Sequence, residues 1–135
     1  MSDEWETPRT EIIKACNILQ IPYPAFDAAC NSKNCKCANR PSVNALKFIW
    51  FQNFFLNPPF SDIDTWLTHA KICVRENELI GLCLLPMKPD QKWFSKHIGE
   101  HFEKVKKFWI PNYRIYYELN GKITRPRFSS FWVIL

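Results

Sequence analysis

Glycine is scarce in this chain of 135 residues, which contains only Gly81, Gly99 and Gly121. None lies in the first half of the sequence, which excludes from that half the glycine-rich turn that holds the cofactor in many α/β enzymes. Long apolar runs are also missing. The longest reach about seven or eight residues, far short of the roughly 20 that cross a bilayer. The acidic start, Met1-Ser2-Asp3-Glu4, has no apolar segment, so we expect no signal peptide.

Acidic residues are few in two regions. From Ala28 to Ser61 there is none, and residues 88–135 carry 4 acidic against 10 basic groups, a net charge of +6. Residues 1–87 are almost balanced, with 8 basic and 9 acidic groups. The basic residues of the last third alternate with aromatic ones, a pattern typical of surfaces that follow phosphates and stack on bases. A solubilising face over an ordinary core explains the same pattern equally well.

Six cysteines without a secretory signal are expected to be cytosolic thiols or metal ligands, not a disulfide framework. Cys30, Cys35 and Cys37, with Cys16 as a fourth ligand, have the side chains of a thiolate zinc site. Their spacing lacks a Cys-x-x-Cys pair, however, which favours structural thiols. The sequence therefore predicts no metal.

Two histidines, His97 and His101, are spaced to share one face of a helix. A metalloprotease motif would need glutamate directly after the first histidine, and Ile98 stands there. A surface pair is the favoured interpretation.

The order of the predicted elements indicates a single α/β domain over residues 1–135, with a mixed, mostly parallel sheet and antiparallel C-terminal strands. Thr7 is expected to cap the first helix and Pro8 to open it. Helices are expected over 8–20, 61–75 and 90–102, and strands over 23–29, 48–56, 79–85, 105–110, 114–119 and 128–135, with a long loop over 30–43 and a hairpin turn at Asn120-Gly121.

The most informative motif is Asn57-Pro58-Pro59-Phe60, directly after an apolar, aromatic strand. A residue before proline is driven into extended geometry, and proline has a fixed φ, so the segment is stiff. The Asn57 side-chain oxygen and the Pro58 carbonyl oxygen can each accept one hydrogen of an –NH2 group. That arrangement turns the nitrogen lone pair toward an electrophile, and Phe60 can stack on a base. A proline-ended turn without chemistry is the alternative.

Several segments together resemble one known family, the small phage-type (Dam-like) DNA adenine methyltransferases, which depend on S-adenosylmethionine. The segments that carry the resemblance run nearly end to end: Trp5-Glu6-Thr7-Pro8, Phe26-Asp27-Ala28-Ala29-Cys30, Asn34-Cys35-Lys36-Cys37, Asn57-Pro58-Pro59-Phe60, Leu84-Leu85-Pro86 with Asp90, Trp93 and Phe94, Arg114-Ile115-Tyr116-Tyr117, and Arg125-Pro126-Arg127-Phe128-Ser129. The family has tyrosine where this chain has Phe60, and an acidic stretch where this chain has residues 38–42.

The resemblance implies a compact Rossmann-like methyltransferase domain that methylates the adenine amine of double-stranded DNA. It also implies a cytoplasmic setting in a prokaryotic host, whether the gene belongs to the host, a virus or a mobile element. The catalytic residues would be Asn57, Pro58, Pro59 and Phe60.

The cofactor would be held at the end of a strand and the start of a helix, where open α/β sheets bind ligands and free N–H groups bind carboxylates. The residues expected to bind S-adenosylmethionine are Thr7, Pro8, Asp27, Ala28 and Asn57. The chain has no glycine-rich turn near Asp27, and no Asp or Glu from Ala28 to Ser61 is present to bind the cofactor's ribose.

Contacts with DNA are expected from the basic last third. The candidates are Lys88, Lys92, Arg114, Arg125 and Arg127. Two alternatives stay open: a methyltransferase that acts on RNA or protein, and a catalytically silent nucleic-acid-binding relative of the same fold.

Overall fold

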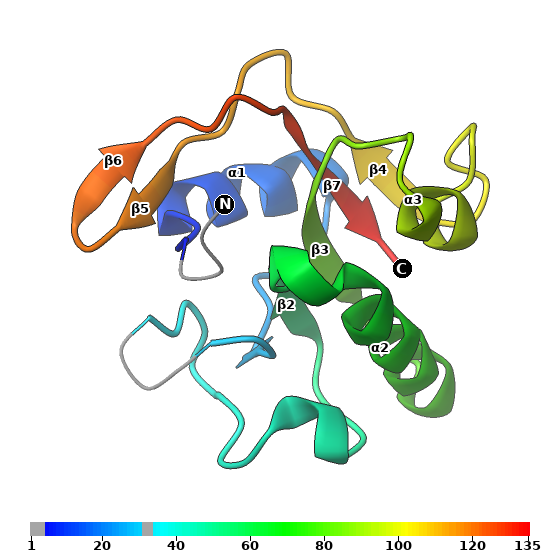
Figure 1. Ribbon diagram of the computed structural model, residues 1–135. Coiled ribbons are helices and arrows are strands. Elements are labelled where there is room, and N and C mark those ends of the chain that lie inside the picture. The colour runs from blue at the N-terminus through cyan, green and yellow to red at the C-terminus, as the bar shows by residue number, and fades with distance from the viewer. Residues whose placement is uncertain (1–4, 31–33) are drawn as a thin grey trace.

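The computed structural model describes residues 5–30 and 34–135 (Figure 1). Residues 1–4, the acidic start, and residues 31–33 of the expected long loop lie outside the described residues. The elements are the helices α1 (Arg9–Leu19), α2 (Ile63–Asn77) and α3 (Lys92–His97), the strands β1 (Phe26–Asp27), β2 (Phe54–Leu56), β3 (Gly81–Pro86), β4 (Lys107–Trp109), β5 (Tyr117–Leu119), β6 (Lys122–Thr124) and β7 (Ser130–Ile134), and two 3-10 helices, Ala45–Lys47 and Phe60–Asp62.

Five of the strands form one mixed sheet in the order β1-β2-β3-β7-β4. The strands β1, β2 and β3 are parallel, whereas β7 runs antiparallel to both β3 and β4. The strands β5 and β6 form a separate antiparallel hairpin around the expected turn at Asn120-Gly121. The α/β class, the mostly parallel sheet and the antiparallel C-terminal strands are therefore confirmed.

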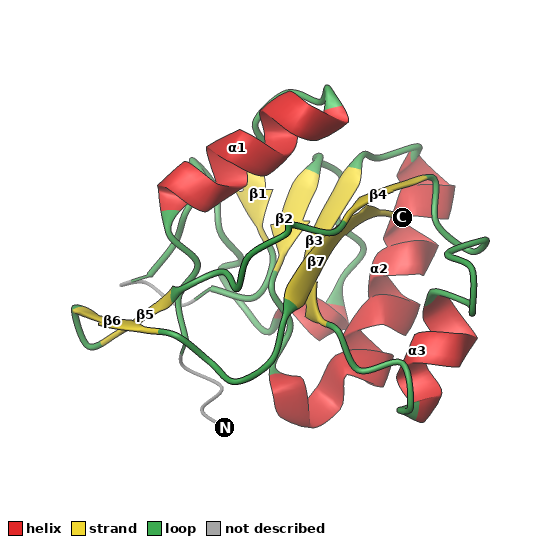
Figure 2. Ribbon diagram, turned by 90° about the horizontal axis from the view of Figure 1, so that it is seen from above, coloured by secondary structure: helices red, strands yellow, loops and turns green. Residues whose placement is uncertain are grey.

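Helices cover both faces of the sheet. Figure 2 shows α1 on one side of the strands, with α2 and α3 on the other. Alternation along the strands explains the two layers, because neighbouring side chains of a strand point to opposite faces. In β7, Phe131 and Val133 pack on the side of α2 and α3, whereas Trp132 and Ile134 pack on the side of α1. Strands buried on both faces need continuous apolar runs, and β3 is buried from end to end.

The paired part of β2 is shorter than the expected strand over 48–56, because side chains bind the backbone before it. The Trp50 N–H donates to Cys73 Sγ (3.3 Å), and the Trp50 carbonyl accepts from Asn77 Nδ2 (2.7 Å). The Ile80 N–H donates to Asn53 Oδ1 (2.8 Å). Strand pairing therefore begins only at Phe54.

The N-terminus of α1 differs from the expectation by one residue. Pro8 is the extended cap (φ −62°, ψ 140°) and makes no capping hydrogen bond, and the helix begins at Arg9. The expected cap at Thr7 is wrong, because its hydroxyl accepts a hydrogen bond from Asn57 instead.

The helix expected over 90–102 ends early, at His97. Gly99 and Phe102 both have positive φ (87° and 58°), which is incompatible with a continuing helix. The interpretation of His97 and His101 as a surface pair is wrong for His97, which is 3% exposed. Its Nε2 lies 2.7 Å from Asp64 Oδ1 and joins α3 to α2. Burial is the main reason why the pKa of His97 is lowered.

One edge of the sheet gathers the ends of several strands. The carboxyl ends of the parallel strands β1, β2 and β3 meet there, and β7 begins at the same edge. Ligands of open α/β sheets bind at this kind of edge. Among the helices of the described residues, none has both the length and the apolar character needed to span a membrane.

The contact between Phe54 and Gly81 generates a stability prediction. These residues pair directly across β2 and β3, and a Cβ added at Gly81 would lie 2.4 Å from Phe54 Cζ. Gly81→Ala is therefore expected to lower the free energy of unfolding by about 1–3 kcal/mol through overpacking. Urea denaturation measures the change. In the Phe54→Leu background the added methyl group should cost much less, and equal costs in both backgrounds would contradict the steric explanation.

Candidate functional site

Asn57 follows β2 directly, and its side chain reaches the segment that leads into α1. Its Nδ2 donates to the Thr7 hydroxyl oxygen (3.2 Å) and to the Trp5 carbonyl oxygen (3.4 Å). Pro58 is buried behind it, and the carbonyl of Pro59 (φ −55°, ψ 131°) accepts from the Asp62 N–H (3.0 Å). The two prolines thus lead from the strand into the 3-10 helix Phe60–Asp62. Their fixed φ angles stiffen the backbone next to Asn57.

The orientation of the Asn57 amide follows from its partners. A backbone carbonyl can only accept, so the –NH2 group must face Trp5. The opposite atom, Asn57 Oδ1, is buried and has no hydrogen-bond partner among the residues that the structure describes. A buried acceptor without a donor is costly, by about 1–3 kcal/mol, and such atoms in folded proteins call for an explanation. The carboxamide is therefore held with its acceptor free.

A small polar pocket of about 30 Å³ adjoins Asn57 at this edge of the sheet. Its lining residues are Trp5, Glu6, Thr7, Asp27, Ala29, Cys30, Asn34, Lys36, Phe55 and Asn57. The pocket unites three of the expected site residues, Thr7, Asp27 and Asn57, which come from the segment before α1, the end of β1 and the end of β2. Two other expected residues, Pro8 and Ala28, directly follow Thr7 and Asp27 in the sequence. Both are buried, and neither lines the pocket.

A second hollow of about 280 Å³ adjoins the first, because Ala29 and Cys30 line both. It is bounded by Ala28 and by residues 40–45 of the following loop, and Trp66 of α2 closes one side. A hollow of about 330 Å³ shares Arg40, Pro41 and Ser42 with the second hollow and extends to residues that precede β2. Another, of about 400 Å³, lies beside β4 and the end of α1. The edge with the strand carboxyl ends is the better place for a ligand.

Asp27 is a buried carboxyl group, 4% exposed, at the end of β1. Its Oδ2 accepts from the Lys36 N–H (2.8 Å). Burial raises the pKa of Asp27 to about 6, although the N–H groups of Lys36 and Ala29 oppose the shift. A raised pKa means that the charged carboxylate is poorly compensated by the protein. A cationic ligand at this place would stabilise it.

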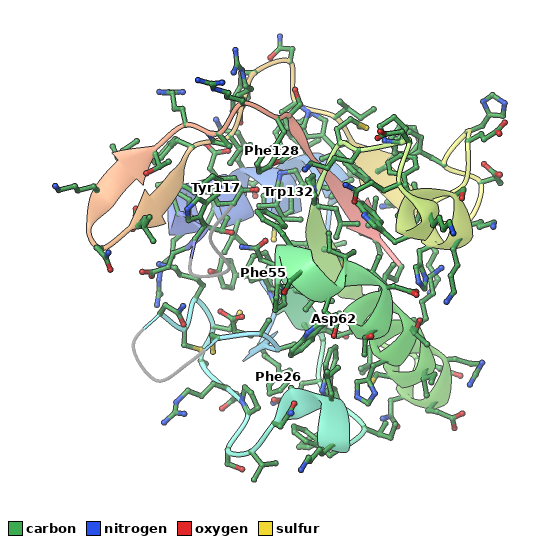
Figure 3. All side chains as sticks on the ribbon, in the orientation of Figure 1. Phe26, Phe55, Asp62, Tyr117, Phe128 and Trp132 are labelled. Carbon is green, nitrogen blue, oxygen red and sulfur yellow. The ribbon has the colours of Figure 1, made fainter. Side chains whose placement is uncertain are left out.

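An aromatic cluster adjoins Asn57 through Trp5, whose carbonyl oxygen accepts from the Asn57 side chain, and of its members the sequence predicted only Phe60 at the site. It consists of Trp5, Phe60, Tyr117 and Phe128. The Trp5 ring stacks on Phe128 (centroids 6.0 Å apart, 11° between planes), and Phe60 meets both rings edge-on (6.2 and 5.5 Å). In Figure 3, Tyr117 and Phe128 lie side by side near Trp132. The four residues come from four separate segments, so no spacing in the sequence predicts the cluster.

The aromatic cluster closes the site in the described conformation. The pocket at Asn57 has the volume of about one water molecule, far too small for a purine. Trp5 is tethered because Glu6 and Glu118 exchange two backbone hydrogen bonds, each 2.8 Å long. A large ligand can reach Asn57 Oδ1 only if the rings of the cluster separate.

Three of the expected DNA-binding residues lie near aromatic rings or the loop before β7. The Lys88 ammonium group is 5.5 Å from the centre of the Phe128 ring, beside the aromatic cluster. The Arg125 guanidinium lies 5.7 Å over the Tyr116 ring. The exposed Arg114 donates to a backbone carbonyl before β7 (3.4 Å). Of these three cations, Lys88 contacts the cluster directly.

The other two expected cations, Lys92 at the start of α3 and Arg127, are exposed. Among the residues that the structure describes, none of the five expected DNA-binding residues forms an ion pair. Other basic groups of the last third have structural partners: Lys96 pairs with Asp64 (2.9 Å), and Lys107 binds the Leu19 carbonyl (2.9 Å). Within residues 5–30 and 34–135, the five expected residues are thus charges without acidic partners.

Comparison with known families gives one match. The family model described as DNA N-6-adenine-methyltransferase (Dam) matches residues 1–130, which include every residue placed at the site above. No curated protein and no solved structure matches the chain.

The hydrogen bond from Asn57 to Thr7 generates the second prediction. Thr7→Val keeps the shape of the side chain and removes the acceptor, and Thr7 is only 2% exposed. The free energy of unfolding should fall by about 1–3 kcal/mol, because a buried amide hydrogen loses its nearer partner. Denaturant titration measures it. Thr7→Ser, which keeps the hydroxyl, is the control and should lose less; equal values for the two variants would show that the hydrogen bond contributes nothing.

Proposed function

This chain belongs to the DNA N-6-adenine-methyltransferase (Dam) family, and from that premise we propose that it methylates the exocyclic amine of adenine in double-stranded DNA with S-adenosylmethionine as the methyl donor. Membership supports the coarse activity, adenine methylation of DNA. The donor, the duplex form of the substrate and the roles of individual residues are the proposal.

The free acceptor on Asn57 is the observation that carries the proposal. Its Oδ1 is buried and without a partner among the described residues, while its Nδ2 is fixed by Trp5 and Thr7. An adenine amine offers two hydrogens, one for this oxygen and one for the Pro58 carbonyl oxygen. With both hydrogens held, the nitrogen lone pair points out of the base plane. The proton of the amine can leave after transfer, so no general base is needed.

The residues around Asp27 fit the cofactor's amino-acid end. Asp27 is a carboxylate without sufficient compensation, suited to an ammonium group, and the nearby start of α1 offers backbone N–H groups to a carboxylate. We place the adenosyl part in the adjoining hollow of about 280 Å³, where the Trp66 ring and the Ser42 hydroxyl line the wall. S-adenosylmethionine, when bound, supplies an electrophilic methyl group. In this chain a hydroxyl thus replaces the missing carboxylate for the ribose.

Access of the base requires that the aromatic cluster open. Duplex DNA hides the amine, so the adenine must leave the stack, and its lost stacking must be replaced by side chains. Phe60 and Phe128, which both contact the Trp5 ring, can provide this contact once that ring moves. We propose that the flipped base takes the place that the Trp5 ring occupies against Phe128. Stacking on an aromatic side chain contributes about 1–3 kcal/mol per base, enough to offset much of the unstacking.

Phosphate contacts are assigned to the five cations without acidic partners. Lys88 stands beside the aromatic cluster, and the proposed contact surface also includes Arg114 and Arg125. Lys92 and Arg127 extend this surface. Such contacts position DNA without reading its sequence.

The direct test of the proposal is transfer of a labelled methyl group to DNA. Asn57→Ala should lower the transfer rate by at least about 100-fold, the usual cost of removing one preorganised hydrogen bond from a reacting group. DNA binding should stay within a few-fold, because Asn57 is not among the phosphate contacts. Asn39→Ala, at an exposed position on the neighbouring loop, is the matched control and should behave like the wild type.

Each result of this test has a defined meaning. Transfer that survives Asn57→Ala rules out the proposed orientation of the amine. A wild-type protein that binds DNA but neither binds cofactor at millimolar concentration nor transfers methyl groups is the silent nucleic-acid-binding relative. Transfer to RNA or protein, with none to DNA, assigns the same chemistry to another substrate.

A further inference from the structure

We propose that the end of β1 carries a binding site for a soft divalent cation, zinc, formed by Asp27, Cys30 and Cys35. The Sγ atoms of both cysteines and one carboxylate oxygen of Asp27 all lie within 4.8 Å of one another. The sequence spacing favours structural thiols for these cysteines, and the fold changes that interpretation because it adds Asp27 as a third ligand. The inference concerns a different chemistry from methyl transfer and does not rest on it.

The distances require only a small adjustment to accept a metal. In a tetrahedral zinc site, with Zn–S bonds of about 2.3 Å, two sulfur ligands are about 3.8 Å apart. The three ligand atoms here are already no more than 4.8 Å apart, so each needs to move by about 1 Å or less. The two thiolates and the Asp27 carboxylate make three protein ligands. The fourth tetrahedral position is left for a water molecule, as in other zinc sites with three protein ligands.

The burial and the charges around Asp27, Cys30 and Cys35 also favour a bound cation. The Asp27 carboxylate is 4% exposed, and the Cys30 and Cys35 thiols beside it are only partly exposed. Two nearby basic side chains already have partners: the Lys36 ammonium pairs with Glu6 (3.2 Å), and Arg9 donates to the Cys35 carbonyl oxygen (3.2 Å). A divalent cation would compensate this crowded set of acids.

The site has a balanced proton count. Cys30 Sγ donates to the Asp27 carbonyl oxygen (3.4 Å), and Cys35 Sγ donates to the Cys37 carbonyl oxygen (3.3 Å). Metal binding breaks these two S–H bonds, forms two Zn–S bonds and one Zn–O bond, and releases two protons. Asp27 binds the metal as a carboxylate and releases none.

Zinc would fix the loop that follows β1. In its described part the Cys35 carbonyl accepts from Arg9 (3.2 Å), and the Lys36 carbonyl accepts from the Tyr23 hydroxyl (2.6 Å). Zinc would add a direct link from this part to the end of β1. Because Asp27 is also the carboxylate proposed for the cofactor's ammonium group, zinc and the cofactor would compete for it.

The test uses the full chain, reduced and freed of metal with a chelator, without cofactor or DNA. Titration with Co²⁺ at pH 8 should give one equivalent of tetrahedral cobalt with thiolate charge-transfer absorption. One equivalent of Zn²⁺ should displace the cobalt. Cys30→Ser and Cys35→Ser should weaken zinc binding at least about 100-fold, since even the loss of an outer-shell partner costs 10–100-fold. Cys73→Ser, a thiol on α2 that binds the Trp50 N–H, is the matched control and should bind normally.

Several outcomes would overturn the site. Among them are an octahedral cobalt spectrum without thiolate absorption and zinc affinity within threefold of wild type in Cys35→Ser. Alkylation gives a second readout that needs no variant: zinc should protect Cys30 and Cys35 from iodoacetamide in the wild type. Unchanged alkylation of both would also refute the site. Neither result bears on methyl transfer, which is measured with chelated protein, so the two proposals fail separately.

Discussion

The structure depends on one junction, the carboxamide of Asn57 bound to the segment before α1. Nδ2 binds Thr7 and the Trp5 carbonyl, so the end of β2 is tied to a part of the chain about fifty residues away. The same bonds decide which atom of the amide is left without a partner among the described residues. Because a carbonyl cannot donate, Oδ1 is left as the buried acceptor. A single hydrogen-bonded amide thus links the fold to the proposed chemistry.

The sequence predicted the parts of the fold that follow from local chemistry. The apolar runs located β2 and β3, and the double proline located the end of β2 at Leu56. Element ends were predicted less well where distant groups decide them. Side chains from α2 take the backbone bonds around Trp50, so β2 is short, and two residues with positive φ end α3 early.

The candidate site was only partly predictable for the same reason. Asp27, Thr7 and Asn57 each stand beside a recognisable strand or helix end, and the fold brings them to one pocket. The stack of Trp5 on Phe128 joins residues at opposite ends of the chain, and no periodic pattern in the sequence predicts this contact. The grouping of Asp27 with two cysteines likewise needs the turn after β1 to be formed. The site is closed in this conformation because the aromatic rings of the cluster contact one another. In the proposed mechanism, contacts between these rings and the base replace contacts among the rings.

Nucleoside analysis of DNA treated with the protein and S-adenosylmethionine tests the account most directly, because the free acceptor on Asn57 specifies which nitrogen reacts. The digest should contain N6-methyl-2′-deoxyadenosine, with the methyl group on the exocyclic amine whose two hydrogens the Asn57 and Pro58 oxygens hold. A methyl group on a ring nitrogen or ring carbon of any base would contradict the account, since neither oxygen has a role in activating those atoms.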